Sequence, residues 1–253
     1  MVTVTENESE KSIHVKQNRL LRTADVKPEE DQILYPVFLG LRTKEGVDDS
    51  LVLDKREGTF KVPDLEFFKL NADQTSIYRT SYTPERLEKL GKAARDGLLS
   101  TEDRAGLVAD AGALAASGYQ KTSGVLNLVK GFTNESEYVV WSEIMARISA
   151  IKAAWLFEGK NVRDGLEAFQ RDLTSDKAHK AGWEFKQDDD HIEQQFKAML
   201  FGVAGGAGDK IIIKAAQDMF AKFAKGDKAA IHPNIRSSVF SIVLKNGGKE
   251  EVS

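Results

Sequence analysis

The stretch that decides the fold is LNADQTSIYRTSYTPERLEKL, which runs from Leu70 to Leu90. Residues 77 to 82 alternate with a period of two, which places Tyr78 and Tyr82 on the same side of a half-exposed strand. The period then changes. Thr83 can cap a helix through its hydroxyl, and Pro84 suits the first helical position because its missing N–H needs no partner there. The stretch therefore predicts a switch from β to α structure.

The part of the chain before this switch consists of short alternating segments separated by turn-forming residues. Several short strands on short connections are typical of an antiparallel β-sandwich, which we place at residues 1–82. The predicted strands are VTVTE near the start, SIHVKQ, YPVFLGLRT, SLVLD, GTFKV, EFFKLNA and SIYRTSY.

The part after the switch, residues 83–253, repeats an amphipathic helical pattern. Ser100 with Asp103 forms a helix start signal, and Gly118 can close that helix. The whole pattern predicts about eight helices, which on short connections pack as antiparallel pairs into an α-solenoid of the HEAT or armadillo kind. A compact bundle is the alternative. Apolar stripes recur at Leu107 to Ala115, Val140 to Trp155, Val162 to Leu173, Ile192 to Val203, Ile212 to Phe223 and Ile235 to Ile242.

Composition excludes several classes of protein. The 36 Lys and Arg nearly balance the 39 Asp and Glu, so a polybasic nucleic-acid surface is not expected. No run of about 18 apolar residues predicts a membrane span, and the first residues do not resemble a secretory signal, which favours the cytoplasm. The absence of cysteine excludes disulfides, thiolate nucleophiles and Cys-rich zinc sites.

The histidines do not form a recognisable metal motif. No two of His14, His179, His191 and His232 stand four residues apart, as the zinc motif HExxH requires. His191 and Glu193 are two residues apart and point to different sides of a helix, which favours a solvated helix start over a metal site. No catalytic, cofactor-binding or metal-binding residue is therefore assigned, although a convergent triad of serine, histidine and carboxylate stays open.

Three other features have a structural and a functional interpretation. Gly202 to Lys210, GVAGGAGDK, matches no phosphate-binding motif and favours a turn between helices. Asp188 to Asp190 could hold a cation, but three acids at a helix N-terminus also complement its dipole, which we favour. The tryptophans could line a pocket, but their helical spacing favours core packing, and they are Trp141, Trp155 and Trp183.

Three stretches closely resemble zinc aminopeptidases of peptidase family M1, of the puromycin-sensitive and alanyl type. They are Phe67 to Leu90, Leu99 to Gln120 and Ile231 to Gly248, and the resemblance covers nearly the whole chain in collinear order. It is closest to fungal members. In that family a small β-sandwich leads into a helical superhelix, which agrees with the predicted switch.

The resemblance also implies what this chain does not contain. The family's HExxH motif, its glutamate ligand and its Gly-Ala-Met-Glu-Asn motif lie in a thermolysin-like domain without a counterpart here. The resemblance thus implies a non-catalytic C-terminal segment, shortened at both ends, which forms a wall of the peptide chamber next to a catalytic domain that binds zinc. Alternatives are an autonomous α-solenoid that binds a protein or peptide, and a hydrolase with an unrecognised site.

A solenoid that stops within its array would present an uncovered apolar face to water. We therefore expect apolar exposure and self-association at the C-terminal helices. The candidates for the exposed face are either Ile212, Met219 and Phe223, or Ile235, Val239 and Ile242.

Overall fold

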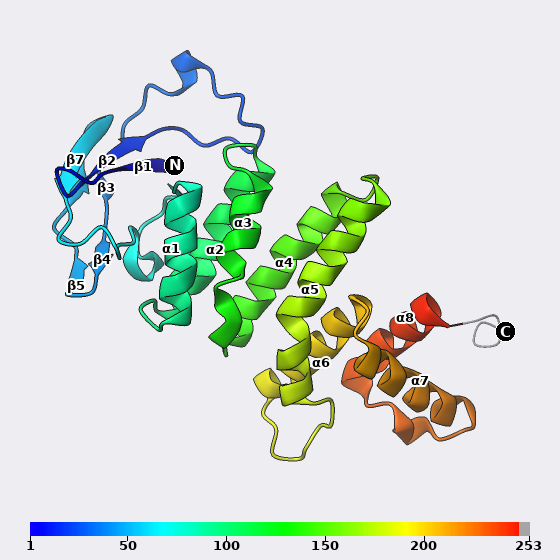
Figure 1. The fold of residues 1–253 in the computed structure, drawn as a ribbon. Helices are drawn as coiled ribbons and strands as arrows, with labels where there is room; N and C mark the ends of the chain where they lie inside the picture. The colour runs from blue at the N-terminus through cyan, green and yellow to red at the C-terminus, as the bar shows by residue number, and fades with distance from the viewer. Residues whose placement is uncertain (248–253) are drawn as a thin grey trace. The chain divides into compact units, whose positions relative to one another are not determined.

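The change from strand to helix occurs where the sequence predicts it. In the computed structural model, which describes residues 1–247, strand β8 (Thr80–Ser81) is followed by helix α1 (Pro84–Arg95). The N–H of Arg86 donates to Thr83 Oγ1 at 3.2 Å, and Pro84 occupies the first turn. N-terminal sheets followed by helices confirm the α+β class (Figure 1).

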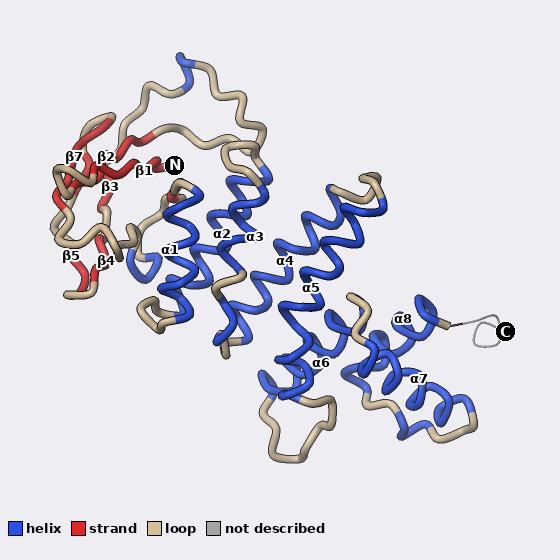
Figure 2. The backbone as a smooth tube through the Cα atoms, viewed as in Figure 1, coloured by secondary structure: helices blue, strands red, loops and turns tan. Residues whose placement is uncertain are grey.

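Three small sheets form the N-terminal part, and their strands are coloured red in Figure 2. A four-stranded sheet has the order β7-β2-β1-β8, and the pairs β3-β6 and β4-β5 stand separately. Alternation along β1 and β2 buries Val4, Ile13 and Val15. The strands before β8 are β1 (Val2–Asn7), β2 (Ser12–Gln17), β3 (Val37–Phe38), β4 (Leu41–Thr43), β5 (Gly46–Asp48), β6 (Val52–Leu53) and β7 (Glu57–Lys61).

One strand pair differs from the predicted antiparallel arrangement. β1 and β8 are parallel, with Val2 opposite Thr80, whereas β1-β2, β2-β7, β3-β6 and β4-β5 are antiparallel. A parallel pair needs a long crossover, which the chain between these distant strands supplies.

Three predicted strands are divided, shorter or absent. YPVFLGLRT is divided at Gly40, whose φ of +50° breaks the extended backbone between β3 and β4. The segment EFFKLNA forms only an isolated bridge between Lys69 and Arg42. Residues 67–70 are all buried, so this segment lacks the alternation of a strand with one wet face. Of the predicted strand SIYRTSY, only β8 forms.

Eight α-helices lie within residues 1–247, in agreement with the predicted number. Two helices lie outside the predicted apolar stripes, namely α1, which follows the predicted helix start at Thr83, and α3. None of the helices in this described range combines the length and apolar composition that a membrane span needs. After α1 they are α2 (Thr101–Ala116), α3 (Thr122–Val129), α4 (Tyr138–Ala154), α5 (Lys160–Ala181), α6 (His191–Gly206), α7 (Lys210–Ala224) and α8 (Arg236–Asn246).

The chain divides into two compact units, Met1–Arg147 and Ile148–Ser253, so the division falls within α4. The first unit contains the sheets and helices α1 to α3, with α1 and α2 both in contact with α3. The predicted domain division between residues 82 and 83 marks the change in secondary structure and stays a prediction as a domain boundary.

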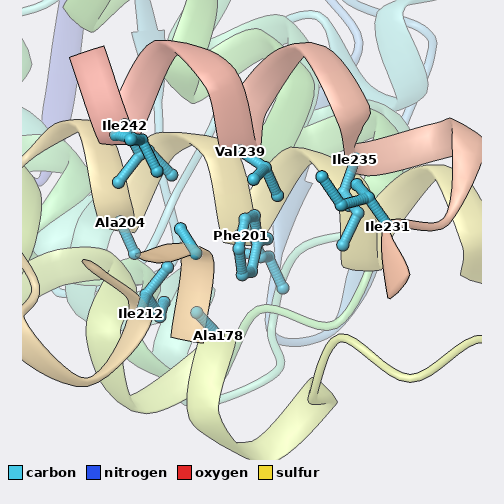
Figure 3. Packing of buried hydrophobic residues seen from close by; sticks show 11 residues of the cluster. Ala178, Phe201, Ala204, Ile212, Ile231, Ile235, Val239 and Ile242 are labelled. Atoms are coloured by element: carbon cyan, nitrogen blue, oxygen red, sulfur yellow. The ribbon is translucent and has the colours of Figure 1, made fainter. Parts of the chain in front are cut away.

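Helices α5 to α8 of the second unit enclose a common apolar core (Figure 3). Phe201 and Ala204 of α6 lie between residues of α5, α7 and α8. The expectation of an exposed apolar face is wrong at the residues named for it, because α8 covers α6 and α7. Four of them are buried, namely Ile212, Ile235, Val239 and Ile242, and Met219 and Phe223 are partly buried against the same core.

Glycine allows α8 to approach α6 closely. A Cβ at Gly205 would lie 2.4 Å from Ile242 Cδ1 and 2.9 Å from Ile212 Cγ2, so a larger residue would force these core side chains to move. The turn predicted for GVAGGAGDK is confirmed, but only its second half is the turn. Its first half is the end of α6, and α7 begins after Asp209.

Candidate functional site

The four histidines each have a different local partner. They therefore take part in separate hydrogen bonds, ion pairs or ring contacts. Across residues 1–247, no group of three or more His, Asp or Glu side chains is placed to hold a metal ion, so the residues present do not fit a zinc site. The partners are Thr59 for His14, Asp209 for His179, Gln195 for His191 and the Phe185 ring for His232.

The acidic run lies at the N-terminus of α6, as the sequence predicts, and Asp190 caps the helix. The Asp190 side chain accepts from the Glu193 N–H at 2.8 Å, and the Glu193 side chain accepts from the Asp190 N–H at 3.1 Å. Asp189 pairs with Lys197 at 2.6 Å. These contacts form a capping box next to an ion pair, and the interpretation of His191 and Glu193 as a helix start is confirmed.

The tryptophans take part in packing. Trp141 is buried, and its Nε1–H donates to the Glu135 carbonyl at 3.1 Å. Trp183 packs against the core of the second unit, with its ring centroid 5.9 Å from that of Phe201. Core packing is confirmed for these two rings, and Trp155 is half-buried.

A buried ionic cluster that the sequence did not reveal lies where the sheets meet α2. Asp103 is fully buried, with Oδ1 2.7 Å from Lys69 Nζ and Oδ2 2.6 Å from Arg42 Nε. Burial lowers the pKa of Lys69, although the carboxylate of Asp103 opposes this effect. The sequence pattern predicts Asp103 at the helix start. Its N–H does donate to Ser100 Oγ at 3.1 Å, but its carboxylate points to the two cations.

The turn beside this cluster has an unusual backbone. Asn71, Asp73 and Gln74 all have φ between 53° and 57°, a region that residues with a Cβ seldom occupy. The Asn71 side chain holds the turn, because it accepts from the Ser76 N–H at 2.9 Å and donates to the Ser76 carbonyl at 2.9 Å. The Asp73 N–H donates to Asp103 Oδ1 at 2.8 Å. The cluster therefore fixes the connection from the sheets to α2, and its charges are already paired.

Tyrosines and a second buried acid complete this junction. The Tyr78 hydroxyl donates to the Leu39 carbonyl at 2.7 Å, and the Tyr82 hydroxyl accepts from the Leu70 N–H at 2.8 Å. Burial raises the pKa of both tyrosines. Asp110 of α2 accepts from the Thr80 N–H at 2.9 Å, and burial raises its pKa. Tyr82 is buried and Tyr78 is partly buried.

An apolar cleft of about 780 Å³ lies within the first unit, and it is the best candidate for a binding site among residues 1–147. It lies between the start of β1, the connection from β2 to β3, and the segment before β8. The β2–β3 connection, residues 18–36, arches away from the sheets (Figure 2). Exposed apolar side chains line the cleft, namely those of Ile33, Tyr35, Phe38 and Ile77.

Hydrogen bonds from side chains fix the backbone around the cleft. The Gln17 amide donates to the Tyr35 carbonyl at 2.9 Å and accepts from the Tyr35 N–H at 3.0 Å, as a strand partner would. Asp31 anchors the arch, because it accepts from Asn18 Nδ2 at 2.7 Å and from Arg56 Nη1 at 3.0 Å. Ser76 Oγ donates to the Phe38 carbonyl at 3.0 Å. A fixed backbone with exposed apolar side chains suits the binding of another apolar surface.

Comparison with known proteins identifies the family. The family described as the ERAP1-like C-terminal domain matches residues 67–253, a range that begins just before the Asn71 turn. The chain belongs to this family. Aminopeptidase 2 of Candida albicans is 54% identical over 239 residues, which are 94% of this chain and 26% of that protein.

Two further fungal relatives agree. "Aminopeptidase 2, mitochondrial" of Saccharomyces cerevisiae is 48% identical, over 99% of this chain and 26% of its own length. Alanine/arginine aminopeptidase of the same species is 42% identical, over 96% and 28%. These relatives confirm the predicted resemblance to M1 aminopeptidases. The chain spans between 26% and 28% of the length of these relatives.

Proposed function

We propose that this chain is the non-catalytic C-terminal region of a zinc aminopeptidase that removes residues from peptide N-termini. The observation that carries the proposal is the match of residues 67–253 to an ERAP1-like C-terminal domain, together with identities of 42% to 54% to aminopeptidases along nearly the whole chain. Zinc and the catalytic groups belong to another part of that enzyme. In this proposal the chain contributes a folded surface and no catalytic group.

In the proposed enzyme the helices form one wall of the peptide chamber and limit the length of peptide that fits. Two features support this role. Helices α5 to α8 share a closed core, so the wall keeps its form without a substrate. Buried ion pairs hold the sheets on α2, so the start of the helical part has a defined orientation to the sheets. We also propose a cytoplasmic location, whereas the name of one relative places that protein in mitochondria.

A chimaera tests this function. The region of Candida albicans aminopeptidase 2 that matches this chain is replaced by the chain, and release of p-nitroaniline from alanyl p-nitroanilide is followed. We expect the chimaera to turn over substrate at a rate within about tenfold of the parent, since aligned positions are 54% identical. The 253-residue chain alone is expected to show no turnover.

The matched controls are the same aminopeptidase without the replaced region and a chimaera with Lys160→Ala, a change at an exposed ion pair. The first should lose activity, and the second should behave as the unmodified chimaera. Turnover by the isolated chain would contradict the proposal. So would full activity of the enzyme that lacks the region, because the chain would then contribute nothing.

The second candidate is an autonomous binding module. The closed core of α5 to α8 favours it, because these helices bury their apolar residues without another domain. A module would bind an unfolded peptide with the same affinity in isolation and in the chimaera. Fluorescence anisotropy of a labelled peptide with both proteins separates the candidates, because the proposed wall binds peptide only in the chimaera.

A further inference from the structure

The four-stranded sheet of the first unit ends in an edge strand. The strand order places β7 outermost, with β2 as its neighbour on one side (Figure 1). Two backbone hydrogen bonds flank this pairing. The Gln17 N–H donates to the Arg56 carbonyl at 2.9 Å, and the Val62 N–H donates to the Lys11 carbonyl at 3.0 Å. Arg56 and Val62 therefore face β2.

Three residues of β7 turn their backbone groups away from β2. Along an antiparallel strand these groups point alternately to one side and to the other, and Arg56 and Val62 fix which side is which. Glu57, Thr59 and Lys61 consequently face the open side. Across residues 1–247, no hydrogen bond satisfies the backbone N–H and carbonyl groups of these three residues. The edge can thus accept a further strand.

The sequence of β7 is complementary to itself when a second copy is turned end for end. In an antiparallel pair centred on Thr59, Glu57 lies opposite Lys61 of the second copy, and Thr59 lies opposite Thr59. The three side chains are all exposed. Opposite charges and paired threonines stabilise neighbouring strands, whereas like charges directly opposite destabilise them. The register that pairs the charges also pairs the free backbone groups, because both belong to the same residues.

The residues beside β7 limit the pairing to the five residues of the strand. Pro63 occupies the next outward position and has no N–H to donate. Lys55, which would lie opposite it, already uses its carbonyl to accept from Gln17 Nε2 at 2.8 Å. So short a pairing buries less than the roughly 1,000 Å² of a stable interface, so the association is weak.

The charges that would pair across the edge have only exposed partners at present. Glu57 Oε2 lies 3.6 Å from Lys16 Nζ and 3.7 Å from His14 Nε2. Lys61 Nζ donates to the Glu10 carbonyl at 2.8 Å, in an exposed contact. Exposed contacts of this kind contribute little, so their exchange for a contact to a second copy costs little.

We infer that β7 is a dimerisation edge, on which β7 of a second copy of this chain pairs in antiparallel register about Thr59. The Thr59 N–H of each copy donates to the Thr59 carbonyl of the other, and the two four-stranded sheets become one continuous sheet. The pairing has two-fold symmetry and closes on itself, so association stops at a dimer. The dimer goes beyond the proposed function, because it involves neither peptide nor a catalytic domain.

Charge reversal tests the register. Glu57→Lys places like charges opposite each other at both ends of the pairing, and so does Lys61→Glu. An equal mixture of the two variants restores both opposite-charge pairs, as does the double variant Glu57→Lys/Lys61→Glu. Sedimentation equilibrium of the 253-residue chain, at concentrations from about 10 μM to about 1 mM, measures each dissociation constant.

We expect the unmodified chain to dimerise with a dissociation constant of about 100 μM. Each single reversal should raise this constant at least about tenfold, and the mixture and the double variant should return it to within about threefold of the unmodified value. Glu88→Lys is the matched control, because it reverses an exposed charge on α1 that pairs with Lys92. It should leave the dissociation constant unchanged.

Variants of Thr59 test the backbone pairing itself. Thr59→Pro removes the N–H that each copy donates, and an edge strand tolerates proline where that group faces solvent, so the dimer should be lost while circular dichroism shows a folded chain. In this cysteine-free chain, Thr59→Cys should form a disulfide-linked dimer, since opposed Cα atoms of such a pair are about 5.5 Å apart. Thr5→Cys, exposed on β1, should not.

Three results would overturn the inference. The first is a chain that stays monomeric up to about 1 mM. The second is a dimer that charge reversal and Thr59→Pro leave unchanged, because association would then use another surface. The third is weakening by the single reversals without recovery in the mixture or the double variant, because the charges would not face each other. If Thr59→Pro does not fold, the charge reversals and Thr59→Cys decide the outcome.

Discussion

The two compact units bury different kinds of side chain. Within residues 1–147, buried charged side chains include Lys69, Arg86 and Asp103, and Arg86 makes two contacts to the Glu6 carboxylate at 2.6 and 2.8 Å. In residues 148–247, the buried charged residue is Asp209, which caps α7. The first unit must join sheets to helices in one orientation, and directional ion pairs can specify it. The second packs helix on helix, for which apolar shape is sufficient.

The largest expected effect concerns the buried ion pairs of the first unit. Asp103→Ala leaves the buried Lys69 cation without its carboxylate and removes one partner of Arg42. We expect the free energy of unfolding to fall by about 3 to 5 kcal/mol, because an uncompensated buried charge remains. Urea unfolding measures the change. Glu66→Ala, which breaks an exposed pair with Lys89, is the control and should cost less than about 1 kcal/mol.

The double variant Lys69→Met/Asp103→Leu sharpens the same point. It replaces the pair with apolar side chains and should recover much of the loss of Asp103→Ala. If the double variant is as unstable as Asp103→Ala, the loss comes from packing or from the Asn71 turn rather than from an unpaired charge.

The next largest effect concerns the apolar core of the second unit. Ile211 and Ile212 are neighbours on α7, but Ile212 is fully buried and Ile211 is 59% exposed. We expect Ile212→Ala to lower the free energy of unfolding by about 2 to 5 kcal/mol, through lost apolar burial and the cavity left behind. Ile211→Ala should change it by less than about 0.5 kcal/mol. Equal effects in urea unfolding would mean that α7 does not face the core as described.

The smallest effect is a difference in alkaline stability. All five tyrosines lie before residue 148, and burial raises the pKa of Tyr78 and Tyr82 above their ordinary value of about 10. The unfolded chain therefore releases these protons first, so their stabilising contribution is complete below about pH 10 and is lost as pH rises. Lys69 acts in the opposite direction, because its pKa is lowered, but its contribution stops growing above about pH 10.5.

Above about pH 10.5 the first unit should therefore lose about 1.4 kcal/mol per pH unit for each buried tyrosine. Tyrosinate absorbance during urea unfolding at several pH values measures the slope. Tyr82→Phe should remove the contribution of one tyrosine to this slope, about 1.4 kcal/mol per pH unit. A slope that Tyr82→Phe leaves unchanged would assign the alkaline loss to other groups.

Other parts of the molecule show why some predictions succeeded. Thr83 and Ser100 cap helices as their sequences indicate, because a cap is an interaction between residues three positions apart, and the acids from Asp188 to Asp190 lie at a helix start as predicted. The segment EFFKLNA was mistaken for a strand because the local pattern does not show that residues 67–70 are all buried. The final helices are predicted to expose an apolar face because a solenoid that stops within its array leaves its last face uncovered, and a helical stripe does not show that α8 closes the core.

The sequence by itself determined the point at which strands give way to helices, the number of helices, and the resemblance to M1 aminopeptidases. These follow from hydrophobic period, capping and quoted motifs, which are all properties of neighbouring residues. Only the tertiary structure decided that Asp103 meets Lys69 and Arg42, that α8 closes the core over Gly205, and that the cleft gathers around Met1. Each of these joins residues far apart in the chain, and their meeting depends on how the whole chain packs rather than on any local preference.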